Sequence, residues 1–240
     1  GLRDLRMWGA WTIWPDGRRW EPMMSAFLPG QALHFATQLS NENIVLENYY
    51  NLNNFGFGTL YSMPPRPPAG EPPFESWERK LNTGLTQVLA SGTVWPQQMS
   101  FTPKGIVVLT PFSSGADEAA AMGSGGTRVG KFTHPCAAPD NDLLVVWSPG
   151  PVNALNRPTS LPAPDAGLYL IPGGGVINSS DELVKIKNNS GYNEVWPRPV
   201  VTYRDVHGVD EPVELPWLPN DGSEHPGLPE GTPYGIVGTS

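Results

Sequence analysis

The sequence is poor in cysteine and in charge. It holds one cysteine, Cys136, in 240 residues, which excludes an internal disulfide framework and a zinc site built on several cysteines. Charged residues make up 16% of the chain, against about 25% in an ordinary globular domain. No apolar run reaches the roughly 18 residues that a membrane-spanning helix needs. The sequence therefore predicts no membrane span.

Positive charge is scarcer than negative charge. There are 15 Lys and Arg residues against 23 Asp and Glu residues, giving a formal net charge of -8. Such a surface repels polyanions as a whole. A nucleic-acid partner is therefore disfavoured.

Glycine, proline and tryptophan are abundant instead. The chain has 27 Gly, 28 Pro and 9 Trp residues, and 39% of it is hydrophobic. Proline removes backbone donors and glycine weakens helix interiors, so the chain cannot be mostly helical. Enough apolar surface is present to offset the entropy of ordering. A loop-rich, aromatic-rich globular fold follows.

Short apolar or alternating runs separated by turn residues predict strands. They cover residues 8–14, 20–27, 33–39, 44–50, 55–63, 105–111, 142–148, 167–171, 183–187 and 200–203. Antiparallel strands joined by turns of this kind indicate an all-β fold. Propeller blades and a β-sandwich both fit the pattern, and no repeat of fixed period is evident.

Composition also suggests how the chain is divided. Residues 64–73 hold six prolines and predict an extended surface linker, and 74–90 is the one run with helical spacing. We expect N-terminal hairpins over 1–63, a linker with a short helix over 64–104, and further blade strands over 105–240. Residues 113–130, which are small and glycine-rich, are expected to be mobile.

Motifs for common chemistries are incomplete. Residues 125–131 nearly match a phosphate-binding loop, but Phe132 stands where a magnesium-binding hydroxyl is needed and no helix pattern follows. No G-x-S-x-G motif supports a serine hydrolase. The adjacent carboxylates at 181–182 and 210–211 are typical of solvated loops rather than of a glycosidase. The tryptophans at 8, 11, 14 and 20 could form a sugar platform, although core filling is the simpler interpretation.

The most suggestive cluster is His134-Pro135-Cys136, with Asp140 and Asp142 close behind. A thiolate with an imidazole suits zinc, and a carboxylate could complete the site. The alternative is a small buried cysteine in a turn. His134 and Cys136 are the candidate metal ligands, and no catalytic residue is nominated.

Several phrases resemble one family. They are the segments 32–61, 133–153, 167–171, 192–201 and 233–240, which include the strings YYNLNNFGFG, THPCAAPDN and YNEVWPRPVV. They resemble the N-terminal and middle region of the hydrazine synthase alpha subunit and its bacterial relatives. This resemblance implies a TolB-like β-propeller, of which the chain would be part, with Ser240 a cut rather than a natural end.

The resemblance implies a role as well as a fold. In that family the redox chemistry lies at c-type haems in a later domain, held by Cys-x-x-Cys-His, which is not found here. A propeller cysteine that helps hold zinc beside a haem would correspond to Cys136. The chain would then be a periplasmic or otherwise extracytoplasmic scaffold that docks other domains or subunits.

A free-standing propeller that binds a carbohydrate or another ligand is the alternative. It would use surface tryptophans with Tyr49, Tyr50 or Tyr61. This alternative predicts exposed aromatic rings, whereas the scaffold predicts a docking surface and no cofactor beyond the possible zinc.

Overall fold

The structure is a computed structural model that describes residues 9–12, 21–25, 31–50, 56–74, 103–113, 129–150, 152 and 165–211. Within these ranges the chain is mostly β, as expected, with antiparallel sheets and one short α-helix. The expected helix over 74–90 lies outside the described residues, apart from Phe74. Most of 113–130 lies outside them too.

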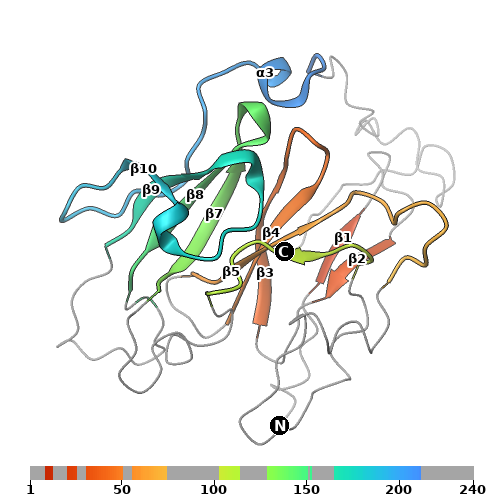
Figure 1. Ribbon diagram of the computed structural model, residues 1–240, viewed down its shortest axis with the longest axis horizontal. Helices are drawn as coiled ribbons and strands as arrows, with labels where there is room; N and C mark the ends of the chain where they lie inside the picture. Colours follow the sequence, from red (N-terminus) through yellow and green to blue (C-terminus); the bar gives the residue numbers. More distant parts are fainter. Residues whose placement is uncertain are drawn as a thin grey trace, which may run out of the picture.

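Two four-stranded sheets dominate the fold (Figure 1). Within each, every strand pairs antiparallel with the next along the chain. The first sheet consists of β3 (Gln31–Gln38), β4 (Ile44–Tyr50), β5 (Thr59–Met63) and β6 (Val107–Val108). The second consists of β7 (Lys131–Ala137), β8 (Leu143–Ser148), β9 (Gly167–Ile171) and β10 (Val184–Lys187). A hairpin of β1 (Gly9–Thr12) and β2 (Glu21–Ser25) stands beside the first sheet.

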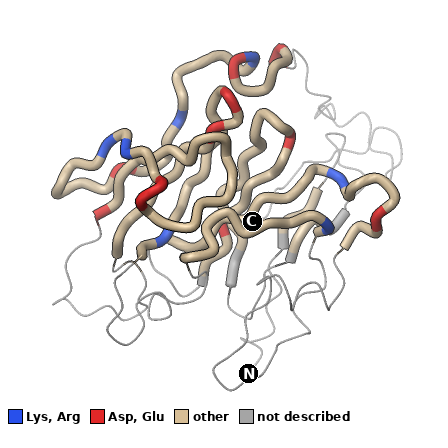
Figure 2. The backbone as a smooth tube through the Cα atoms, viewed as in Figure 1, with Lys and Arg blue, Asp and Glu red and all other residues tan. Residues whose placement is uncertain are grey.

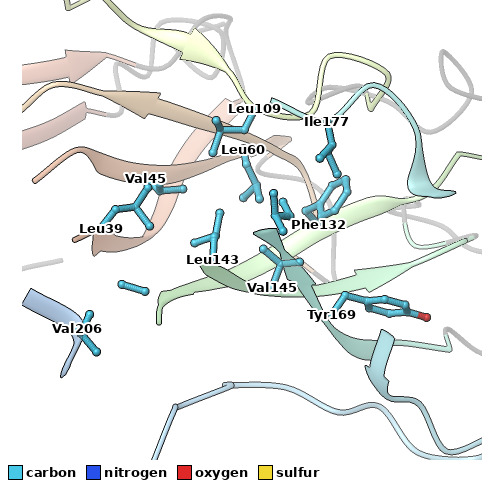
Figure 3. Packing of buried hydrophobic residues seen from close by; sticks show 12 residues of the cluster. Leu39, Val45, Leu60, Leu109, Phe132, Leu143, Val145, Tyr169, Ile177 and Val206 are labelled. Atoms are coloured by element: carbon cyan, nitrogen blue, oxygen red, sulfur yellow. The ribbon is translucent and has the colours of Figure 1, made fainter. Parts of the chain in front are cut away.

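The three units are stacked face to face. One face of the first sheet, with Val45 and Leu60, packs against Leu143 and Val145 of the second (Figure 3). Its other face, with Leu46, Tyr61 and Met63, packs against Met24 of β2. Because successive side chains of a strand point to opposite faces, the first sheet supplies apolar side chains to both interfaces.

The two sheets repeat one plan. A shift of 99 residues, as from 35 to 134, carries the register of β3 and β4 onto that of β7 and β8. Thus Thr37 pairs with Val45, and Cys136 pairs with Leu144. Both first strands carry a bulge at the matching place, between His34 and Thr37 in β3 and between Thr133 and Cys136 in β7.

The third strands repeat as well, with a longer shift. Glu47 pairs with Leu60 in the first sheet, and Val146 pairs with Leu168 in the second, which is a shift of 108 for the third strand (60 to 168). Both third strands contain Leu-Tyr and end before a proline, Pro64 or Pro172. The spacing differs between strands, so a search for a fixed period misses the repeat.

Strand β6 is shorter and more exposed than the buried strand expected over 105–111. Among the described strands it pairs with β5 alone, which makes it the edge strand of this sheet, and Val107 is exposed while Ile106 and Leu109 are buried on either side. Because β6 belongs to the first sheet, that sheet continues past the expected linker over 64–104.

The strand expected over 200–203 is wrong. Val200 and Val201 are exposed, and the chain then forms helix α3 (Tyr203–His207). Thr202 caps the helix, since its hydroxyl accepts a hydrogen bond from the Asp205 backbone while Asp205 accepts from Thr202. Gly208 ends it in the left-handed conformation. This capping chemistry outweighs the β propensity of two valines.

Candidate functional site

His134 and Cys136, the expected metal ligands, lie on either side of Pro135 in the bulged part of β7. The Cys136 side chain is buried, and its thiol donates to the Ala137 carbonyl at 3.6 Å. Asp142, at the end of the adjoining turn, accepts from the Gly173 backbone at 2.6 Å. Among the described residues, no three His, Cys, Asp or Glu side chains are grouped so that they could hold a metal.

His134 instead belongs to an aromatic cluster with Phe35 and Trp196. Its ring stacks on Phe35 with 4.0 Å between centroids and an interplanar angle of 29°. Trp196 meets His134 at 4.2 Å and Phe35 at 5.2 Å, both in edge-on orientations. These are the favourable arrangements of aromatic pairs. Three segments far apart in sequence therefore converge on one contact.

All three members of the aromatic cluster have a left-handed backbone. Their φ angles are 51° at Phe35, 49° at His134 and 57° at Trp196. Residues with a Cβ atom adopt this region rarely, at a cost of about 1 kcal/mol or more, and such strain gathers at functional sites. The mutual packing of the rings offsets that cost at all three positions.

Phe35 and His134 are counterparts in the repeat, and Trp196 matches them. A proline follows Trp196, as one follows His134. Glu194 donates its backbone N–H to Ala166, which precedes β9, at 3.0 Å. Likewise Phe132, two residues before His134, donates to Gly58, which precedes β5, at 2.9 Å. The segment at 193–198 thus enters beside the second sheet in the way that β7 enters beside the first.

A buried carboxyl group is linked to the aromatic cluster. Glu47 is fully buried on the face of the first sheet that meets β7. Thr133 donates its hydroxyl to Glu47 Oε2 at 2.9 Å and lies 3.1 Å from His134 Nδ1. In the described part of the chain, Glu47 Oε1 has no hydrogen-bond partner. Thr133 therefore connects a carboxyl group inside the fold to a ring at its surface.

Burial sets the protonation of both ends of this link. Burial raises the pKa of Glu47 well above its usual value, against the opposing effects of the Thr133 hydrogen bond and the Lys131 charge. Partial burial, then the nearby Arg198 and His34, lowers the pKa of His134 to about 4. His134 is therefore neutral at pH 7, and one of its nitrogens is left as an acceptor.

The outer side of the aromatic cluster is accessible. Trp196 is 56% exposed, and the guanidinium carbon of Arg198 lies 5.9 Å from its ring centroid. His34, the neighbour of Phe35, contacts the Tyr49 ring edge-on at 4.9 Å. Elsewhere along the described backbone, Lys and Arg positions are scattered, singly or in pairs (Figure 2).

Other expected candidates fall into structural roles. Glu182 accepts from the Ser179 backbone in the capping box of a 3-10 turn, and Asp210 pairs with Arg204. Lys131, at the end of the glycine-rich loop, enters strand β7 rather than a helix. Tyr61 is buried, and burial raises its pKa, so it is no surface aromatic. Trp11 is exposed, while the tryptophans at 8, 14 and 20 lie outside the described residues.

Comparisons of the chain with protein-family models, with curated proteins and with solved structures gave no match. Among the described residues, no helix is long and apolar enough to cross a membrane.

Sequence reasoning singled out His134 but missed Phe35, Glu47 and Trp196 as its neighbours. Proline after both His134 and Trp196 was an available signal, although two dipeptides 62 residues apart (134 to 196) are weak on their own. Glu47 gave a second signal, because a carboxylate in the middle of a strand that is mostly apolar is costly to bury unless it is paired or hydrogen-bonded.

Proposed function

We propose that the chain is a β-propeller scaffold in which the two four-stranded sheets are successive blades. The observation that carries this proposal is the repeated register with its repeated bulge. Propellers are built from four-stranded antiparallel blades stacked around an axis, and each blade packs on its neighbours. The face-to-face stack of the hairpin and the two sheets is in keeping with that plan.

A segment after the second sheet supports the same proposal. The segment 193–198 repeats the entry of β7, including the backbone hydrogen bond of Glu194 to Ala166. On the outer face of the second sheet Val146 is buried, whereas among the described residues Leu144, Leu168 and Leu170 are only half-buried and Val184 is exposed. Val45 and Leu60, the counterparts of Leu144 and Leu168 in the first sheet, are fully buried. A third blade would complete this burial.

As a scaffold, the chain would dock other domains or subunits of an extracytoplasmic protein. We propose, on the resemblance to the hydrazine synthase alpha family, that any haem redox chemistry lies in a domain outside this chain. No residue described here forms a recognised catalytic group. Propeller ends are loop-rich and suit docking, although the fold alone fixes no partner.

In this proposal, zinc would bind only at a site shared between this chain and the docked domain or subunit. His134 and Cys136 would supply two ligands, whereas structural zinc takes four. The missing ligands would come from the docked domain or subunit. Cys136 is also buried, so the loop around it would have to open for the thiol to reach a metal.

The mass and the visible spectrum of the polypeptide purified from its natural source test the scaffold role. A mass well above 26.0 kDa with a haem band supports a blade segment within a redox protein. A polypeptide of this chain's mass without haem contradicts the redox context. Zinc content in that preparation, compared with Cys136→Ser, tests the shared site, and equal zinc in both rejects it.

A ligand-binding propeller is the second candidate, and a specific observation favours it. Trp196 is large, strained and more than half exposed, beside an arginine and a neutral histidine. Exposed aromatic rings held rigidly by strain and packing are typical of binding sites.

A further inference from the structure

The aromatic cluster occupies a special place in the repeat. Phe35, His134 and Trp196 are matching positions of successive repeats, and their rings touch. Matching positions of stacked blades can meet only near a common axis. The aromatic cluster therefore marks the hub of the assembly, where several loops present side chains to one small volume.

The hub combines a flat apolar surface with a positive charge. Trp196 is 56% exposed as a residue, and the guanidinium carbon of Arg198 lies over its ring, 5.9 Å from the centroid. Arg198 Nη1 donates to the Pro197 carbonyl at 2.8 Å, which restrains the side chain. Among the described residues, carboxylates pair with Lys104 and Arg204, and none pairs with Arg198. An available guanidinium fork favours a carboxylate as its partner.

The remaining contacts favour a ligand with hydrogen-bonding groups beside its flat face. Because the Thr133 hydroxyl donates to Glu47, it accepts from His134 Nδ1 at 3.1 Å, which fixes the ring and leaves Nε2 as the acceptor nitrogen of the imidazole. Glu47 buttresses that hydroxyl from the interior, so the imidazole is oriented by two groups in succession. Trp196, Arg198 and His134 thus offer a stacking face, an anion fork and an acceptor side by side.

We propose that Trp196, Arg198 and His134 form a binding site for a small carboxylate with a flat apolar face, either a uronic acid or an aromatic carboxylate. The ligand stacks on the exposed indole face while its carboxylate takes the Arg198 fork. Inorganic phosphate has no such face. This inference deepens the ligand-binding alternative and does not depend on the proposed docking role or on zinc.

Isothermal titration of the purified chain with glucuronate, benzoate, glucose and inorganic phosphate tests the site. We expect glucuronate, benzoate or both to bind in the millimolar range. Arg198→Gln should weaken this binding at least about tenfold, because a charge-assisted pair is lost. Trp196→Ala should abolish measurable binding. The matched controls Arg204→Gln and Trp11→Phe change an exposed arginine and an exposed tryptophan outside the aromatic cluster and should leave binding unchanged.

The pattern across ligands identifies the class. Binding of glucuronate alone supports a sugar acid, binding of benzoate alone supports an aromatic acid, and binding of both supports the shared chemistry. Equal binding of glucose or phosphate overturns the proposal, as does unchanged affinity in Arg198→Gln or the absence of binding by both acids. Urea midpoints close to that of the wild type show that a variant lost a contact and not its fold. A failure here leaves the scaffold proposal standing, since the polypeptide's mass and spectrum test it separately.

Discussion

The two four-stranded sheets share a backbone plan. They differ in how far their faces are buried and in the polarity of side chains at matching positions. The first sheet is covered on both faces, by the β1–β2 hairpin and by the second sheet. The outer face of the second sheet is only partly covered by described residues, and Val184 there is 50% exposed. The same register therefore occurs in a sheet that is covered on both faces and in one that described residues cover only in part.

Side chains at matching positions differ more than the backbone does. Glu47 of the first sheet corresponds to Val146 of the second, and Phe35 corresponds to His134. The polar link from Glu47 through Thr133 to His134 crosses between the sheets, and Val146, the counterpart of Glu47, has no carboxyl group with which to repeat it. The repeat places residues at matching positions, and the different side chains at these positions make the polar link.

The sharpest test of the difference in cover uses matching leucines. Leu60→Ala removes a fully buried side chain from the interface between the sheets and should lower the free energy of unfolding by about 3 kcal/mol or more. Leu168→Ala, at the matching but partly exposed position, should lower it by about 1 kcal/mol. Urea denaturation measures both. Equal losses would show that the outer face of the second sheet is as well covered as the first.

Glu47→Gln tests the buried carboxyl group through pH. Since folding raises the pKa of Glu47, its stabilising contribution is complete below the unfolded value of about 4.5 and is lost as pH rises towards the folded value. The variant lacks this loss. Its stability relative to the wild type should improve by up to about 1.4 kcal/mol per pH unit above pH 4.5.

Urea titrations of both proteins at several pH values measure that difference. The result that would contradict this account is a wild type whose stability increases relative to that of Glu47→Gln as pH rises. Glu47 would then be ionised in the fold and stabilised by Lys131, whose charge acts on it.

A hydrogen bond between the sheets offers a smaller perturbation. The Ala137 backbone donates to the Thr37 hydroxyl at 3.0 Å. Thr37→Val keeps the shape but leaves that N–H group without an acceptor, so the free energy of unfolding should fall by about 1–2 kcal/mol. Thr37→Ser keeps the acceptor and is the control. If the valine variant is as stable as the serine variant, this hydrogen bond does not contribute to stability.

The smallest expected effect concerns His134. Folding lowers its pKa from 6.5 to about 4, so the neutral form is favoured and its contribution is present above pH 6.5. That contribution is lost as pH falls from 6.5 to 4. For a half-exposed ring it is on the order of 1 kcal/mol after allowance for solvent screening.

His134→Phe should remove this part of the acid destabilisation, and His207→Phe, on α3, serves as the matched control. Urea midpoints at pH 7 and pH 4.5 show the effect. If the loss of stability between pH 7 and pH 4.5 is the same in His134→Phe as in the wild type, the lowered pKa of His134 is contradicted.

Much of the sheet structure could be predicted from sequence because alternation and turn residues are local signals. The runs at 44–50, 142–148 and 167–171 contain strands of the structure, and the run at 33–39 overlaps β3, which begins two residues earlier. Helix α3 was missed because its capping box, Thr202 with Asp205, competes with a preceding pair of valines.

The candidate site was harder to predict, since its geometry depends on pairing between distant segments. His134 attracted attention as a neighbour of Cys136, but the bulge at 133–136 turns its ring towards Phe35 and Trp196. A left-handed aromatic residue has no sequence signature comparable to that of glycine. Only the register of both sheets reveals that Phe35 and His134 are counterparts.

The measurement that tests the central claim most directly is the set of ring-to-ring nuclear Overhauser effects among Phe35, His134 and Trp196 in selectively labelled protein. If matching positions of successive repeats converge, all three pairs give cross-peaks, because their ring centroids lie 4.0 to 5.2 Å apart. Cross-peaks between Phe35 and His134 with none to Trp196, in a folded sample, would contradict a third repeat at the hub.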